Sequence, residues 1–202
     1  EGLAATADRM RATRGYLAQQ SETLARACLT WSDCGAVEIA TEAYRNAHQE
    51  LRHRVLGAML RHVGRQDYPP RREQLIALET RVLGQAAATL HGCEVRPKAG
   101  KIVVTREFAA CPPSVGISTG RWDGWVFDQL PSTTKVGALG EAGLLQCPDW
   151  RASGYPRRAL LATPAAWNCD ELIAAPLAGL GPDWHCCLEE GEKDFYDALA
   201  MR

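Results

Sequence analysis

Residues 71–106 read RREQLIALETRVLGQAAATLHGCEVRPKAGKIVVTR, and their hydrophobic period changes at Gly84. Before Gly84, apolar residues stand three or four positions apart, at Leu75, Leu78 and Val82. That spacing predicts a helix with one buried face, and glycine is a typical end for it. After Gly84, two runs at 93–96 and 102–105 flank a turn, Pro97-Lys98-Ala99-Gly100, which predicts a hairpin. A helix followed by a hairpin indicates an α+β fold.

The chain before this stretch has a helical pattern. A long helix with a narrow apolar seam is expected from Leu3 to Cys28, because apolar residues recur every seven positions, at Leu3, Met10, Leu17 and Leu24. After a short alternation at 37–39, Thr41 is expected to cap a second helix that ends at Gly64. Tyr68-Pro69-Pro70 then places a proline in the first turn of a third helix. Residues 1–88 are therefore expected to form a helical domain, a long helix plus a helical hairpin.

The chain after Gly84 has a β-rich pattern. Beyond the first hairpin we expect one strand at 122–127 and a turn entering a short helix at 136–146. A second hairpin is expected with arms at 160–167 and 172–177, followed by a strand at 184–188 and a short amphipathic helix through Phe195 and Leu199. Residues 89–202 are therefore expected to form a small mixed β-rich domain.

The composition limits the class of protein. With 202 residues and 46% hydrophobic content, the chain can bury a core. No apolar run is long enough to cross a bilayer, and the first residues do not resemble a signal peptide, so a cytoplasmic protein without membrane contact is expected. The eight cysteines include no pair at the two- to four-residue spacing of a structural zinc site. We expect them to be buried or partly buried free thiols.

Positive charge is concentrated in the first half of the chain. Residues 1–98 hold 14 basic and 11 acidic residues, whereas the remainder holds 9 and 13. Seven arginines fall within 45–72, against Glu50 and Asp67 alone. If residues 51–65 are helical, Arg54, Arg61 and Arg65 share one face, and guanidinium groups suit phosphate oxygens. A solvated helix face would look the same, because the chain uses 19 arginines and only 4 lysines throughout.

No complete active site is evident in the sequence. It contains neither of the glycine-rich phosphate-binding patterns, Gly-x-x-x-x-Gly-Lys-Ser/Thr and Gly-x-Gly-x-x-Gly, and it lacks Ser-Gly-Gly-x-Asp-Ser. A cysteine nucleophile with His48 or His185 as its base could be assembled only on paper, since no motif marks these residues. We rank a stand-alone cysteine enzyme last.

The order of the elements resembles the region that follows the catalytic domain in tRNA(Ile)-lysidine synthetases. The matching order is a long linker helix, an arginine-bearing helix, the break at 64–70, the helix from Arg71 and the hairpin. Two later stretches are similar to that family's small C-terminal domain: Val136 to Gly143, and Arg157-Arg158 followed by Pro164, Trp167 and residues 170–176. The resemblance covers essentially the whole chain.

This resemblance implies the tRNA-recognition portion of an ATP-dependent carbon–nitrogen ligase that joins lysine to the wobble cytidine of tRNA(Ile). ATP and Mg²⁺ would belong to the parent enzyme, in a missing N-terminal catalytic domain, so this fragment alone is expected to be inactive, with no catalytic residue, metal or cofactor. Its predicted RNA-binding residues are Arg52, Arg54, Arg61, Arg65, Arg71, Arg72, Lys98 and Lys101. The alternative is a helical protein–protein adaptor or homodimer, in which the seam of the first helix pairs with a partner helix.

Overall fold

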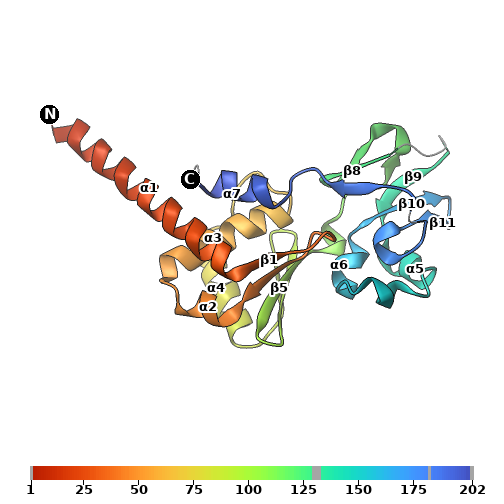
Figure 1. Ribbon diagram of the computed structural model, residues 1–202, viewed down its shortest axis with the longest axis horizontal. Helices are drawn as coiled ribbons and strands as arrows, with labels where there is room; N and C mark the ends of the chain where they lie inside the picture. Colours follow the sequence, from red (N-terminus) through yellow and green to blue (C-terminus); the bar gives the residue numbers. More distant parts are fainter. Residues whose placement is uncertain (1, 129–132, 182, 201–202) are drawn as a thin grey trace.

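Helices and antiparallel sheets make up the computed structural model, which describes residues 2–128, 133–181 and 183–200 (Figure 1). The expected α+β class is confirmed. The helices are α1 (Gly2–Cys28), α2 (Thr41–Asn46), α3 (Gln49–Val63), α4 (Arg72–Leu83), α5 (Gly140–Leu145), α6 (Arg157–Leu161) and α7 (Glu192–Ala200). The strands are β1 (Leu29–Trp31), β2 (Val37–Ala40), β3 (Ala88–Leu90), β4 (Cys93–Lys98), β5 (Lys101–Arg106), β6 (Val115–Gly116), β7 (Arg121–Trp122), β8 (Trp125–Phe127), β9 (Lys135–Ala138), β10 (Pro164–Asn168), β11 (Glu171–Ala174) and β12 (Cys186–Leu188).

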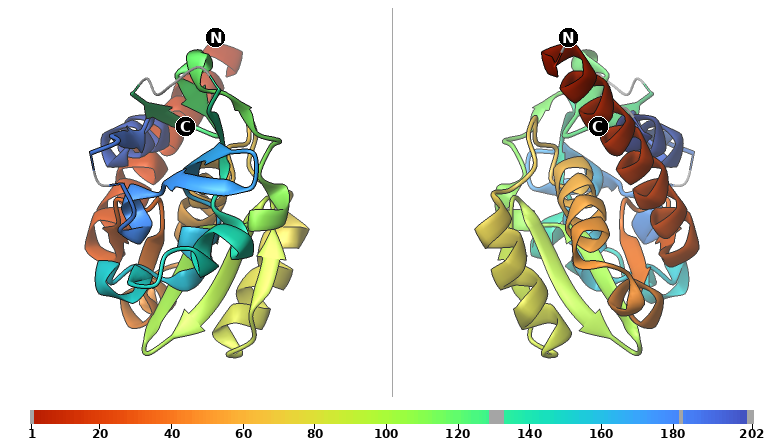
Figure 2. Two further views of the ribbon diagram at one scale, coloured as in Figure 1. Left: turned by 90° about the vertical axis from the view of Figure 1, so that its right-hand side faces the viewer. Right: turned by 90° about the vertical axis from the view of Figure 1, so that its left-hand side faces the viewer.

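A five-stranded antiparallel sheet in the order β1-β2-β5-β4-β3 supports the helices of the first half. Ile102 and Val104 of β5 share a core with Val55 and Met59 of α3, which lies across the sheet (Figure 2). The alternate residue Val103 is also buried, on the side of the sheet that α6 approaches. The expected hairpin is confirmed, and its core joins residues on both sides of the domain division predicted at 88 and 89.

The long helix α1 is anchored only in its C-terminal half. Its buried residues are small and lie three or four positions apart, at Ala18, Ser21, Ala25 and Cys28, so the helix backbone can approach α3 closely. The N-terminal half projects away from the body of the protein (Figure 1). Its apolar seam is therefore uncovered, with Leu3 89% and Met10 68% exposed.

The helix expected from Thr41 to Gly64 is two helices, which corrects the prediction. Ala47 is extended, and His48 caps α3, with its ring Nδ1 accepting a hydrogen bond from the Glu50 amide at 3.2 Å. Thr41 does not act as the cap, because Ala40 occupies that position. The predicted stops at Gly64 and Gly84 are confirmed. Both prolines precede α4, whose N-cap is Arg71, so neither lies in its first turn.

The second half contains two small sheets, in the orders β11-β10-β9-β6 and β12-β8-β7. The single strand expected at 122–127 is a hairpin, because Asp123 and Gly124 both take positive φ angles of 44° and 73° and turn the chain. The first arm of the later hairpin is also shorter than expected, since Leu160 belongs to α6 and β10 begins at Pro164. The hairpin of β10 and β11 and the helix through Phe195 and Leu199 are confirmed.

The C-terminal helix α7 returns to the first half of the chain and packs against α1 and α3 (Figure 1). Its contact is an aromatic cluster in which His62 lies edge-on to Trp31 and Phe195, with ring centroids 5.4 and 5.8 Å apart. Burial, together with the nearby charges of Arg65 and Arg61, lowers the pKa of His62 to about 4. The imidazole in this cluster is therefore neutral at pH 7.

Stability is expected to fall as the pH falls from 6.5 to 4, because His62 takes up a proton in the unfolded chain, where its pKa is about 6.5, but not in the folded protein. This pKa shift corresponds to a decrease in the free energy of unfolding on the order of 3 kcal/mol, which is complete near pH 4. Urea unfolding at pH 7 and pH 4.5 measures this loss, and His62→Gln should remove most of it. His185→Gln, at an exposed histidine, is the control. An unchanged pH dependence in His62→Gln would contradict the assignment.

Among the described residues, no helix combines the length and the apolar character needed to cross a membrane.

Candidate nucleic-acid interface

Two adjoining hollows run between α1 and α3 and share the side chain of Arg54. We call them together the α1–α3 groove. The outer hollow has a volume of about 430 Å³ and is lined by Thr6, Arg9, Met10, Thr13, Arg14, Leu17 and Arg54. The inner hollow, of about 270 Å³, reaches from α1 past α3 to the start of α4 and includes Glu50 and Arg72.

The helical period of α1 places two of its arginines, Arg9 and Arg14, in this groove. The lining positions on α1 are 6, 9, 10, 13, 14 and 17, which all fall on one helix face. Leu17 lies one turn before the buried Ser21, so the anchored half of α1 fixes the direction in which the free half points. Arg9 and Arg14 consequently face Arg54 of α3 across the groove.

The groove carries an excess of positive charge. Glu50 accepts hydrogen bonds from Arg54 at 3.0 Å and from Arg72 at 3.1 Å, and these contacts, that of Arg72 first, lower the pKa of its carboxyl group. Glu50 is thus ionised and holds the two guanidiniums in place. Within the described part of the chain, no carboxylate pairs with Arg9 or Arg14. Four arginines and one glutamate therefore line the groove.

The predicted RNA-binding residues separate into three groups in the structure. Arg54 and Arg72 line the groove, and Arg71 lies exposed beside them at the start of α4. Lys98 and Lys101 lie at the tip of the β4–β5 hairpin and do not line the groove. Arg52, Arg61 and Arg65 are half-buried and do not line the groove either. The role of all eight residues in RNA binding stays a prediction.

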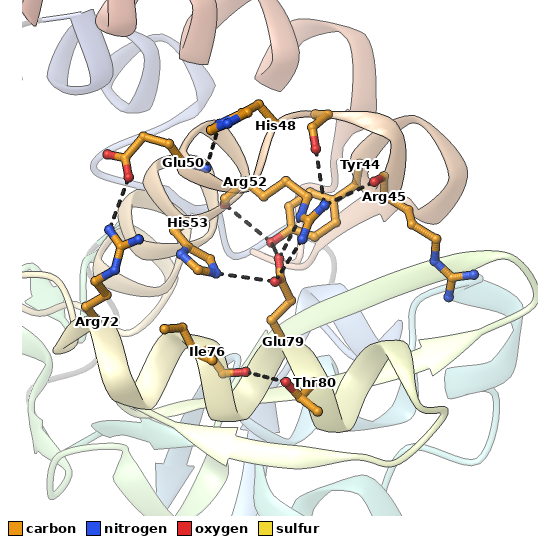
Figure 3. Close-up of polar contacts among 11 residues, drawn as sticks. Tyr44, Arg45, His48, Glu50, Arg52, His53, Arg72, Ile76, Glu79 and Thr80 are labelled. Carbon is orange, nitrogen blue, oxygen red and sulfur yellow. Dashed lines mark hydrogen bonds and ion pairs between the residues drawn. The ribbon is translucent and has the colours of Figure 1, made fainter.

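Arg52 is engaged in a buried polar network (Figure 3). Its Nε and Nη2 donate to the two carboxylate oxygens of Glu79 at 3.0 and 3.2 Å, and its Nη1 donates to the carbonyls of Arg45 and Ala47 at the end of α2. Tyr44 donates to Glu79 as well, at 2.8 Å. Although burial works against the charge of Glu79, the hydrogen bonds from Arg52 and Tyr44 lower the pKa of its carboxyl group. Arg52 thus joins α2, α3 and α4.

Arg61 lies in the last turn of α3 and Arg65 just beyond its end. The Nε of Arg61 is buried, with no hydrogen-bond partner among the described residues. Arg65 lies against Gly124, where an added Cβ would stand 2.6 Å from the arginine Nε. Burial lowers the pKa of Arg65, although Asp123 nearby raises it. Arg65 therefore contributes to packing between the halves.

Sequence reasoning missed Arg9 and Arg14, which lie outside the arginine-rich segment at 45–72. A signal for them existed, because both stand next to the seam on the helical wheel: Arg9 precedes Met10, and Arg14 lies three residues before Leu17. The seam indicated the face that α1 turns toward the protein. Arginines beside that face were candidates for a groove with the next helix.

The arrangement of guanidinium groups in the groove can bind anions. Among the described residues, no three His, Cys, Asp or Glu side chains converge as a metal site would require. The eight cysteines are free thiols. Cys169 and Cys187 are exposed, which corrects the expectation that all eight are at least partly buried. Cys169 lies in the turn between β10 and β11, and Cys187 lies on the edge strand β12.

Comparison with known proteins gives two relatives. The chain is 36% identical to the tRNA(Ile)-lysidine synthase of Ruegeria pomeroyi over 178 residues, which are 87% of this chain and 42% of that protein. It is 31% identical to the tRNA(Ile)-lysidine synthase of Anaplasma marginale over 96 residues, 46% of this chain and 21% of that protein. The chain thus spans less than half the length of the curated relatives it matches. No family model and no solved structure matches it.

Proposed function

Because this chain is related to the tRNA(Ile)-lysidine synthases, we propose that it is the portion of such an enzyme that holds tRNA(Ile), and not the portion that performs the chemistry. The parent enzyme would join lysine to the wobble cytidine with ATP and Mg²⁺, in the cytoplasm. The ATP site would lie in a catalytic domain outside this chain. Two facts support this division: the chain matches only 42% of its first relative, and its sequence lacks a phosphate-binding glycine loop.

The observation that carries the proposal is the α1–α3 groove. Arg9, Arg14, Arg54 and Arg72 line it together with a single glutamate, Glu50, and each guanidinium retains N–H donors that no described residue accepts. Forked guanidiniums bind phosphate oxygens in pairs and fix the register of a nucleic acid without reading its sequence. The groove is therefore suited to the sugar–phosphate backbone of one strand.

Salt dependence of tRNA binding tests the proposal. Arg9→Gln combined with Arg14→Gln should weaken the binding of a tRNA(Ile) transcript about tenfold or more at low salt. It should also reduce the slope of log affinity against log salt concentration by roughly 1 to 2, because two phosphate contacts are lost. Fluorescence anisotropy titrations at four salt concentrations measure both quantities.

The matched control is Arg151→Gln combined with Lys193→Gln, which removes the same charge at exposed positions that do not line the groove. It should leave the slope close to that of the unmodified chain. Equal slopes in the two double variants would show that the groove does not contact phosphate.

One observation, the uncovered seam of α1, favours the alternative function as a protein–protein adaptor. Leu3 and Met10 are both more than half exposed, and they lie on the face that a partner helix could cover. Sedimentation of the chain alone separates the two functions. A dimer that forms with rising concentration and does not bind tRNA would support the adaptor, and a monomer that binds tRNA would support tRNA recognition.

A further inference from the structure

The inner hollow of the α1–α3 groove has mostly apolar walls behind a charged rim. Gly57 and Ala58 of α3, Pro69, Leu75 of α4 and Leu199 of α7 line it. Its volume of about 270 Å³ is smaller than the 300–1,000 Å³ typical of pockets for drug-sized ligands. A flat ring with few substituents suits such a space, because flat rings pack well against short aliphatic walls.

One residue that lines this hollow has a buried polar atom without a hydrogen-bond partner among the described residues. His53 lines the hollow and is only 5% exposed, and its Nε2 lies 3.3 Å from a carboxylate oxygen of Glu79. The other ring nitrogen, Nδ1, is buried and forms no hydrogen bond with any described residue. Figure 3 shows the two ring nitrogens, one directed at Glu79 and the other turned away from it.

The network behind His53 decides which tautomer is present. Glu79 is ionised and already accepts from Arg52 and Tyr44, so it can only accept from His53 as well. In the neutral imidazole the proton is therefore on Nε2, and Nδ1 presents a lone pair. A buried acceptor without a donor is costly, and a ligand that supplies an N–H group would satisfy it.

The rim of the hollow carries positive charge that could bind an anionic group of a ligand. Arg54 uses its Nε and Arg72 its Nη1 to hold Glu50, which leaves other N–H groups of both guanidiniums available to an anion. Thus one site combines apolar walls, a buried acceptor and a cationic mouth.

We propose that the inner hollow binds one unpaired ribonucleotide of the RNA, with the base against Gly57 and Leu75 and one of its N–H groups donating to His53 Nδ1. The phosphate of that nucleotide lies at Arg54 and Arg72. This inference rests on the proposed function, because it places a single nucleotide of the bound tRNA beside the backbone contacts of the outer hollow. Contacts to phosphate carry no sequence information, whereas the hydrogen bond between the base and His53 would distinguish one base from another.

Two substitutions at His53 separate its two ring nitrogens. His53→Gln extends an amide to the position of Nε2 and keeps a donor for Glu79, but it removes the acceptor at Nδ1. His53→Asn does the opposite, because its shorter side chain places an oxygen near the position of Nδ1. The probes are AMP, CMP, GMP and UMP, with ribose 5-phosphate and inorganic phosphate as base-free controls. The ¹⁵N resonance of His53 Nδ1 and calorimetric titration report binding.

At least one of the four nucleotides is expected to move the Nδ1 resonance, while the base-free probes leave it in place. His53→Gln should weaken the binding of that nucleotide about tenfold, whereas His53→Asn should stay within about threefold of the unmodified chain. The inference is overturned if no nucleotide moves the resonance, if ribose 5-phosphate moves it equally, or if His53→Gln binds as tightly as the unmodified chain. The Arg9 and Arg14 variants test the proposed function separately, since they lie in the outer hollow and tRNA binding reports on them directly.

Discussion

Glu79→Ala is expected to lower the free energy of unfolding by about 4 kcal/mol, which is in the range measured when one partner of a buried ion pair is removed. Glu79 is 7% exposed and receives hydrogen bonds from Arg52, Tyr44 and His53. Its loss leaves a largely buried guanidinium without a counter-charge and releases the contact of α2 and α3 with α4. Urea unfolding of the variant at pH 7 measures the loss.

Glu73→Ala is the matched control, because Glu73 lies on the same helix but is exposed and makes no ion pair with a described residue. It should change stability by no more than about 0.5 kcal/mol. A loss below about 1 kcal/mol in Glu79→Ala would show that the network around Arg52 is not what holds these helices together.

Asp123→Asn is expected to lower the free energy of unfolding by about 3 kcal/mol. It should also weaken the contacts between the two halves of the chain. Asp123 is paired with Arg106 through both oxygens, at 3.0 and 3.1 Å, and Arg106 also donates to the carbonyls of Gly64, Gly92 and Ala110. The amide keeps the size of the side chain and tolerates the positive φ of the turn, so the change isolates the charge. Without that charge, the largely buried guanidinium of Arg106 keeps its carbonyl acceptors but has no counter-charge.

Amide hydrogen exchange locates the effect of this substitution. The amides of β7 and β8 should exchange faster in Asp123→Asn, because their turn is tied to β5 through Arg106. Asp128→Asn, at an exposed position after β8, is the control and should leave both exchange and stability nearly unchanged. If the amides of β7 and β8 exchanged at the same rate in Asp123→Asn and in Asp128→Asn, the role assigned to Asp123 would be contradicted.

The arginines of the middle segment illustrate how far helical spacing predicts a surface. A straight helix through 41–64 would have displayed Arg54, Arg61 and Arg65 together on a solvent face. Instead, α3 is covered on several sides, by the sheet, by α1 and α7, and by the β7–β8 hairpin near its end. Only Arg54 of the three lines the groove. Arg65 lies beyond the end of α3, where a positive φ of 55° takes it off the helical face and it packs against Gly124.

The sequence by itself determined the class of the fold, most of its elements and the relationship to tRNA(Ile)-lysidine synthases. Hydrophobic period, glycine stops and turn residues are local signals, and they located α1, the stops at Gly64 and Gly84 and the β4–β5 hairpin. Only the tertiary structure decided which arginines face a groove and which are held by contacts within the protein, because that depends on how α1 packs on α3 and on carboxylates distant in sequence, such as Glu79. The same packing leaves His53 Nδ1 without a partner in the described structure, and no spacing rule could have predicted it.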